Sequence, residues 1–140
     1  MEPRTHSVSL SCDAAAAFEA FTDRISDWWP EAYTPDPDQF DGVVIEPGVG
    51  GRVVMRMSGG VEHQFGEVTA WDPGRTYGQT WTLSQDPGSP SSITVSFTDT
   101  DSGSEVVLEH GGWHEGNAAH RQKFADWQLI LERYAFVAST

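Results

Sequence analysis

Two histidines near the carboxyl end of the chain have the residue types and spacing of a metal site. His110 and His114 lie four residues apart in EVVLEHGGWHEG, and Glu115 follows them. The surrounding residues are typical of a strand end, where residues four apart are separated by about 13 Å, too far to share one zinc ion unless the double glycine folds the chain back. A third ligand would have to come from His63 or Cys12. We therefore expect no metal ion and no other cofactor.

His110 alone allows two interpretations. In a strand over residues 104–113, Val106, Leu108 and His110 share one face. If the two apolar residues face the concave side of a sheet, a neutral imidazole lies there too and could hydrogen-bond a ligand or exchange a proton near neutral pH. The alternative is a buried structural histidine whose nitrogens are satisfied by a backbone carbonyl or by water.

A second group of candidate residues lies on the segment TYGQTWTL, residues 76–83. Alternation places Gln79 and Trp81 on one face, where they could form the polar group and the aromatic wall of a pocket, although tryptophan at such a position is more often a core residue. No serine occupies a strand-to-helix GxSxG turn, and no base can be placed beside Cys12. Covalent catalysis is unsupported, and we expect no catalytic residue.

Two adjacent tryptophans, Trp28 and Trp29, end a helical stripe that begins after Asp13, a predicted N-cap. Apolar residues recur at spacings of three and four along this stripe, and Pro30 disfavours a helical conformation at Trp29. One helix, or two short helices separated by a bend, would satisfy the pattern. Packing is the favoured role of the two rings, and a position at the rim of a cavity is the alternative.

The remaining elements predict a sheet and one long helix. The segment 117–138 predicts a helix that carries Trp127, Leu131 and Tyr134 on one face. We predict an α+β helix-grip architecture, in which a curved antiparallel sheet of about seven strands wraps around the C-terminal helix and leaves a cavity between them. After a first strand at residues 4–12, six strand segments are bounded by turn residues: FDGVVIE, RVVMRM, VEHQFGEVTAW, TYGQTWTL, SSITVSFTD and SEVVLEHGGW.

Two glycine-containing segments are predicted to be turns rather than ligand sites. EPGVGGR, residues 46–52, precedes a strand, whereas a phosphate-binding glycine loop opens a helix. DTDSGSE, residues 99–105, lacks flanking helices and the bidentate glutamate of a calcium loop.

The composition of the chain limits its partners. The 140 residues carry a formal net charge of -13, which disfavours nucleic acid and anionic membrane surfaces. The single cysteine, Cys12, excludes an intramolecular disulfide, and no apolar run has the length of a membrane span. We predict an acidic, cytoplasmic protein with one domain over residues 1–140.

Five segments in order span nearly the whole chain: VSLSCDAAAAFEAFTDRISDWWP, EPGVGGRVVMR, GEVTAWDPGRTYGQTW, SSITVSFTDTDSGSEVVLEHGGW and DWQLILERY. Together they resemble the heat-shock-protein-90 ATPase activator homologue family, within the START-like, Bet v 1-like (SRPBCC) superfamily. The resemblance implies the helix-grip fold and a cavity: many members bind apolar or aromatic small molecules, some relatives are polyketide cyclases or aromatases, and eukaryotic namesakes assist the chaperone. These residues contain no counterpart of the namesakes' separate amino-terminal chaperone-binding domain.

The leading prediction is non-catalytic binding of a small apolar or aromatic molecule between the sheet and the C-terminal helix. One alternative is a cyclase, aromatase or related enzyme that uses the same pocket, with His110 as acid or base. Another is a protein-interaction module resembling a co-chaperone. The predicted ligand-binding residues are Trp29, Gln79, Trp81, His110, Trp127, Leu131 and Tyr134.

Overall fold

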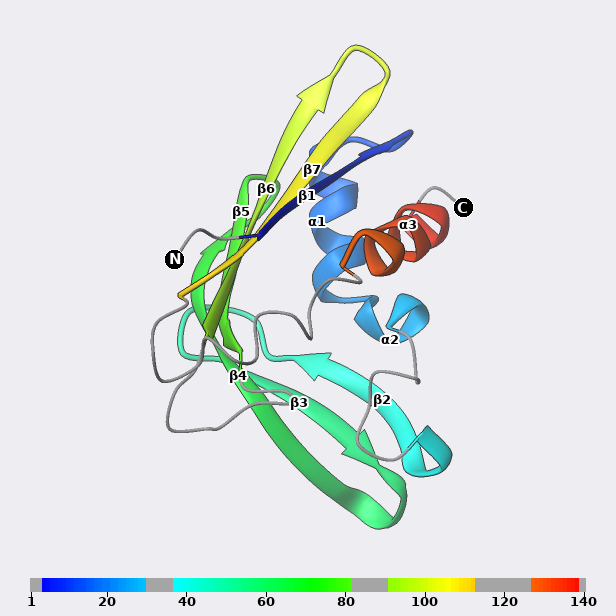
Figure 1. Ribbon diagram of the computed structural model, residues 1–140, viewed down its shortest axis with the longest axis vertical. Helices are drawn as coiled ribbons and strands as arrows, with labels where there is room; N and C mark the ends of the chain where they lie inside the picture. The colour runs from blue at the N-terminus through cyan, green and yellow to red at the C-terminus, as the bar shows by residue number, and fades with distance from the viewer. Residues whose placement is uncertain (1–3, 30–36, 82–90, 113–126, 139–140) are drawn as a thin grey trace.

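The computed structural model describes residues 4–29, 37–81, 91–112 and 127–138 of the chain. Within them, seven strands form one curved antiparallel sheet in the order β1-β7-β6-β5-β4-β3-β2 (Figure 1). This arrangement confirms the predicted helix-grip fold. The strands are β1 (Arg4–Leu10), β2 (Phe40–Ile45), β3 (Arg52–Met57), β4 (Val61–Asp72), β5 (Thr76–Trp81), β6 (Ser91–Thr100) and β7 (Gly103–Gly111).

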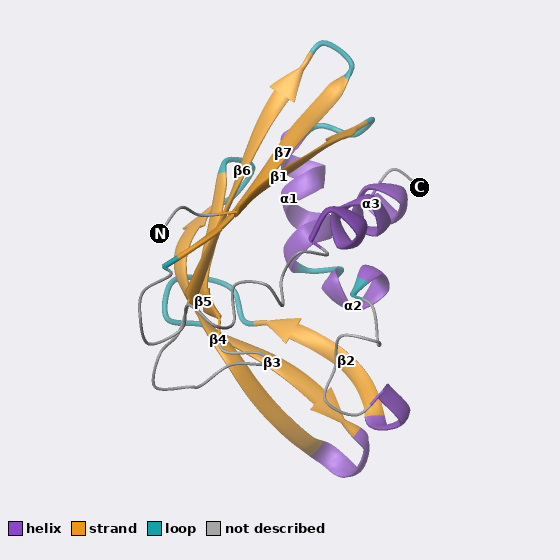
Figure 2. Cartoon of the chain, in the orientation of Figure 1, coloured by secondary structure: helices purple, strands orange, loops and turns teal. Residues whose placement is uncertain are grey.

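The three α-helices of the described residues lie together on one side of the sheet (Figure 2). They are α1 (Ala14–Thr22), α2 (Ile25–Trp28) and α3 (Trp127–Ala138). The first ten residues of the predicted helix 117–138 lie outside the described residues. Short 3-10 turns occupy η2 (Pro37–Gln39) and η3 (Ser58–Gly60). No helix in the described part of the chain is long and apolar enough to cross a membrane.

The first helix begins where two carboxylates satisfy its free amides. Asp13 is the N-cap, as predicted, and its Oδ1 accepts a hydrogen bond of 2.8 Å from Ala16 N. Asp99, at the end of β6, accepts a second bond of 2.8 Å from Ala14 N. The start of α1 is therefore fixed both by its own sequence and by the sheet.

Ser26 holds α2 against the edge of the sheet. Its hydroxyl donates to Val43 O and accepts from Val43 N, each at 2.8 Å. Among the described strands β2 is an edge strand, so none of them pairs with Val43 on that side, and the serine supplies hydrogen bonds that a neighbouring strand would otherwise make. This contact places the end of α2, including Trp29, over the concave face.

A β-bulge directs Phe65 into the core. Val53 pairs with Gly66 and Val54 with Gln64, so Phe65 is an additional residue on β4. Phe65 is buried, whereas Gln64 is exposed. Gly66 is required here, because a Cβ would lie 2.5 Å from both Gln79 Nε2 and Thr80 O. The bulge therefore bends the sheet and adds an aromatic ring to its concave face.

Candidate functional site

All seven predicted ligand-binding residues are buried between the sheet and the helices. They come from the end of α2, from β5, from β7 and from α3. Three of the aromatic side chains and the histidine lie together with Phe65, which was not among the predicted residues. We call these five residues the aromatic cluster: Trp29, Phe65, Trp81, His110 and Trp127.

The rings of the aromatic cluster contact one another. The ring centroids of Trp81 lie 5.2 Å from Phe65 and 5.3 Å from Trp127, in edge-to-face arrangements. Trp29 is less closely packed, at 5.7 Å from Trp81, 6.1 Å from Trp127 and 6.4 Å from Phe65. All of these separations are within the range of favourable aromatic pairs. In this conformation the rings themselves occupy the space between sheet and helix.

Hydrogen bonds fix the tautomer of His110. Trp127 Nε1 donates to His110 Nδ1 at 2.9 Å, and His110 Nε2 lies 2.7 Å from Ser91 Oγ. An indole nitrogen can only donate, so Nδ1 carries no proton and the neutral ring is protonated at Nε2. His110 therefore donates to Ser91, which is the opposite of the arrangement in which a histidine base activates a serine nucleophile.

Burial keeps His110 uncharged. It lowers the pKa of His110 to about 3, and the nearby His6 lowers it further in the same direction. The side chain is fully buried. At neutral pH the imidazole is therefore a neutral hydrogen-bonding group rather than a source of protons.

The other predicted polar residues are satisfied by the protein itself. Tyr77 Oη donates to Gln79 Oε1 at 2.7 Å, and Gln79 Nε2 donates to Thr80 O at 3.0 Å. Tyr134 Oη donates to Ala17 O at 2.6 Å. Burial raises the pKa of both tyrosines well above the usual value. The Tyr134 bond joins α3 to α1, whereas both Gln79 bonds lie within β5.

Trp29 differs from Trp28 and Trp127 in its indole nitrogen. Trp28 Nε1 donates to Ala20 O at 2.9 Å, and Trp127 Nε1 donates to His110. Trp29 is only 3% exposed, yet within the described residues its Nε1 has no acceptor. The cluster therefore contains a buried hydrogen-bond donor that the described residues leave unsatisfied.

The candidate metal ligands do not assemble in the described part of the chain. His63 is exposed on β4, Cys12 is half-buried after β1, and His110 is buried inside the cluster. His114 and Glu115 lie outside the described residues. Among those described, no group of three His, Cys, Asp or Glu side chains could hold a metal ion.

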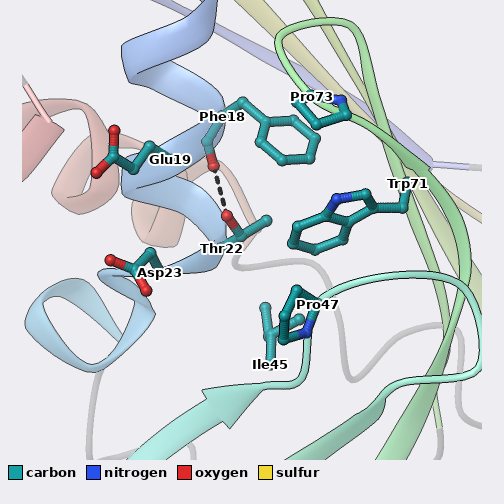
Figure 3. Close-up of a pocket in the computed structure, with 8 residues that line it drawn as sticks. All are labelled: Phe18, Glu19, Thr22, Asp23, Ile45, Pro47, Trp71 and Pro73. Atoms are coloured by element: carbon teal, nitrogen blue, oxygen red, sulfur yellow. Dashed lines mark hydrogen bonds between the residues drawn. The ribbon is translucent and has the colours of Figure 1, made fainter.

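A separate pocket of about 240 Å³ lies outside the aromatic cluster (Figure 3). Phe18 and Trp71 form its aromatic wall, with ring centroids 5.1 Å apart, while the carboxylates of Glu19 and Asp23 point away from the rings. Its volume is below the roughly 300 Å³ at which ligand pockets usually begin. The lining residues are Phe18, Glu19, Thr22, Asp23, Ile45, Pro47, Trp71 and Pro73.

Neither Phe65 nor this pocket was predicted from the sequence. Phe65 enters the cluster through a bulge, which regular alternation along β4 does not reveal. The pocket joins α1 to the connections after β2 and β4. In the sequence, the spacing of Phe18 and Thr22 could have indicated this pocket, because residues four apart on α1 lie on one helical face.

Comparison with known families gave one match over most of the chain. The family described as Activator of Hsp90 ATPase homolog 1-like protein matches residues 11–135. A search of curated protein sequences gave no match.

Solved structures with the same fold cover nearly the whole chain. A protein from Mesorhizobium loti is similar at 22% identity, with a TM-score of 0.70, over 96% of this chain and 95% of that chain. The Aha1 dimer from Colwellia psychrerythraea is similar at 20% identity, with a TM-score of 0.71, over 99% and 97%. An anthrahydroquino-gamma-pyrone synthase complexed with SUM is similar at 27% identity, with a TM-score of 0.65, over 98% and 97%.

Proposed function

The chain belongs to the family of Activator of Hsp90 ATPase homolog 1-like proteins, and on this premise we propose that it binds a small neutral aromatic molecule. The proposed site is the aromatic cluster between the concave face of the sheet and α3. One observation carries the proposal: three tryptophans from separate elements, Trp29, Trp81 and Trp127, converge on one buried histidine-containing site. Aromatic side chains provide large contact area and well-defined ring geometry for such a ligand.

The absence of charge in the cluster favours a neutral ligand. Its members are four aromatic residues and a histidine that burial keeps neutral. An ion transferred into this site would lose its hydration without gaining a charged partner among the described members of the cluster. The net charge of the chain, -13, further opposes an anion.

Binding requires the rings to separate. The rings contact one another in this structure, so a ligand must take the place of ring-to-ring contacts. Trp29 has the longest centroid separations of the four aromatic residues, between 5.7 and 6.4 Å. It also lies at the end of the four-residue helix α2, where the backbone leaves the helical conformation with ψ of 123°. We therefore expect a ligand to enter beside Trp29.

Two further observations support an aromatic ligand at the aromatic cluster rather than at the surface pocket. The surface pocket beside Phe18 and Trp71 is smaller than typical ligand pockets, and the carboxylates of Glu19 and Asp23 point away from its rings. The likeness to an anthrahydroquino-gamma-pyrone synthase complexed with SUM, at 27% identity, concerns nearly the whole of both chains. That likeness also keeps a catalytic use of the site as the competing function, although the tautomer and low pKa of His110 oppose acid–base catalysis in this conformation.

Titration with fluorene and 9-fluorenone tests the proposal. Both compounds are neutral, and both should change tryptophan fluorescence saturably and raise the melting temperature. A ligand at one hundred times its Kd adds about 2.7 kcal/mol to the free energy of unfolding. The matched control is Trp71→Phe, which alters the surface pocket and should bind both compounds as the wild type does. The proposal is wrong if neither compound binds, or if Trp71→Phe abolishes the binding.

A further inference from the structure

The unsatisfied indole nitrogen of Trp29 gives the proposed site a chemical preference. Its Nε1 is buried and has no acceptor among the described residues, whereas the adjacent Trp28 donates to Ala20 O at 2.9 Å. The large majority of buried polar side-chain atoms in folded proteins are hydrogen-bonded. An unsatisfied donor of this kind costs free energy, because the hydrogen bond to water is lost and none replaces it.

This donor lies where we expect the ligand to enter the aromatic cluster. Trp29 has the two longest ring separations in the aromatic cluster, at 6.1 Å from Trp127 and 6.4 Å from Phe65. A ligand that enters beside Trp29 would lie within reach of its N–H. The donor and the loosest packing of the cluster therefore belong to the same side chain.

We propose that Trp29 Nε1 donates a hydrogen bond to a ketone or quinone oxygen of the aromatic ligand and thereby selects carbonyl-bearing compounds. This inference rests on the proposed function, since it specifies which aromatic molecules the cluster prefers. Trp29 is then a specificity-determining residue. Its ring forms part of the wall of the site, and its nitrogen hydrogen-bonds one ligand atom.

The remaining polar atoms of the cluster favour a carbonyl over a hydroxyl. An indole nitrogen only donates, so its partner must accept. A ligand hydroxyl could accept from Trp29, but its own proton would then need an acceptor. Within the described part of the cluster, His110 Nδ1 is already occupied by Trp127, and the other nitrogens, including His110 Nε2, are donors. A carbonyl oxygen satisfies Trp29 without adding an unsatisfied donor.

The test compares fluorene with 9-fluorenone, which have the same fused rings and differ by one carbonyl group. Kd is measured for both compounds with the wild type, Trp29→Phe and Trp28→Phe, by calorimetry so that the readout does not depend on the replaced tryptophans. The wild type should prefer 9-fluorenone by about tenfold, the magnitude of one hydrogen bond. Trp29→Phe should lose this preference and still bind fluorene, whereas Trp28→Phe should retain the preference. Circular dichroism checks that both variants are folded.

The outcomes separate this inference from the proposed function. If the wild type binds fluorene and 9-fluorenone equally, or if Trp29→Phe keeps the preference, the inference is overturned and the binding function stands. An equal weakening of both compounds in Trp29→Phe would also overturn it, because the ring and not the N–H would then matter. If neither compound binds the wild type, the proposed function itself fails. As a second readout, the indole proton resonance of Trp29 should move downfield with 9-fluorenone and remain near its position with fluorene.

Discussion

Trp127 Nε1 donates a hydrogen bond of 2.9 Å to Nδ1 of His110, and both side chains are buried. This bond joins α3 to β7, two elements that the fold brings into contact through the packing of α3 over the concave face. It also fixes the proton of His110 on Nε2 and so directs that nitrogen toward Ser91. One bond therefore holds the helix against the sheet and keeps the centre of the aromatic cluster uncharged.

Replacing Trp127 should show how much this bond contributes to the free energy of unfolding. Trp127→Phe keeps an aromatic ring but leaves His110 Nδ1 buried without its donor. The control is Trp71→Phe, in which a phenyl ring likewise replaces a half-buried indole, at the surface pocket. We expect the free energy of unfolding to fall by about 1–3 kcal/mol more in Trp127→Phe than in this control. Urea unfolding measures both losses, and equal losses in the two variants would contradict the structural role of the bond.

The burial of His110 predicts a pH dependence of stability. Burial lowers its pKa in the folded protein to about 3, whereas the unfolded chain has the ordinary value of about 6.5. As the pH falls below 6.5, His110 becomes protonated in the unfolded state but stays neutral in the folded state. The contribution of His110 to stability is therefore full above pH 6.5 and is lost progressively between pH 6.5 and 3, at up to about 1.4 kcal/mol per pH unit.

Urea unfolding of the wild type and His110→Gln, at pH values between about 5 and 7.5, isolates this effect. Other titrating groups are common to both proteins, so the stability difference should narrow as the pH falls. A difference that stays constant with pH would show that His110 is not buried in the neutral form. If His110→Gln does not fold, titration of the His110 ring protons in the wild type by NMR provides the same test.

The adjacent tryptophans should differ in their cost of replacement. Trp28→Phe removes the donor of a 2.9 Å bond and leaves Ala20 O without it, whereas Trp29→Phe removes a donor that has no partner among the described residues. Both variants keep a ring and lose similar apolar area. We expect Trp28→Phe to be the less stable by about 1–3 kcal/mol in urea unfolding. A Trp29→Phe variant as unstable as Trp28→Phe would contradict an unsatisfied Trp29.

Ser26 should stabilise the edge of the sheet. Ser26→Ala removes both 2.8 Å bonds to Val43 and should lower the free energy of unfolding by about 1–2 kcal/mol. The Val43 amide should also exchange faster with solvent, because its acceptor is lost. Ser96→Ala, on the exposed face of β6, is the matched control and should leave both quantities near their wild-type values. Unchanged exchange at Val43 in Ser26→Ala would contradict the role of this contact.

The sequence predicted the fold better than the site. Glycine- and proline-containing turns separate most of the strands, and β6 and β7 alternate regularly between more and less buried residues, so these bounds follow from local chemistry. The inward face of β7, with His110 on it, followed from the same alternation. Phe65 could not be placed, because a bulge changes which side chains of β4 face the core. The hydrogen bonds of His110 could not be predicted either, since Trp127 and Ser91 lie far from it in sequence and meet it only in the folded chain.

The indole N–H resonances of the six tryptophans provide the most direct test of ligand binding at the aromatic cluster. After assignment by single replacements, the protein labelled with ¹⁵N is titrated with 9-fluorenone. If the ligand binds between the sheet and α3, the signals of Trp29, Trp81 and Trp127 shift together and saturably, while that of Trp71 at the surface pocket stays in place. If no signal moves, or if only that of Trp71 moves, the aromatic cluster is a packed core and not a binding site.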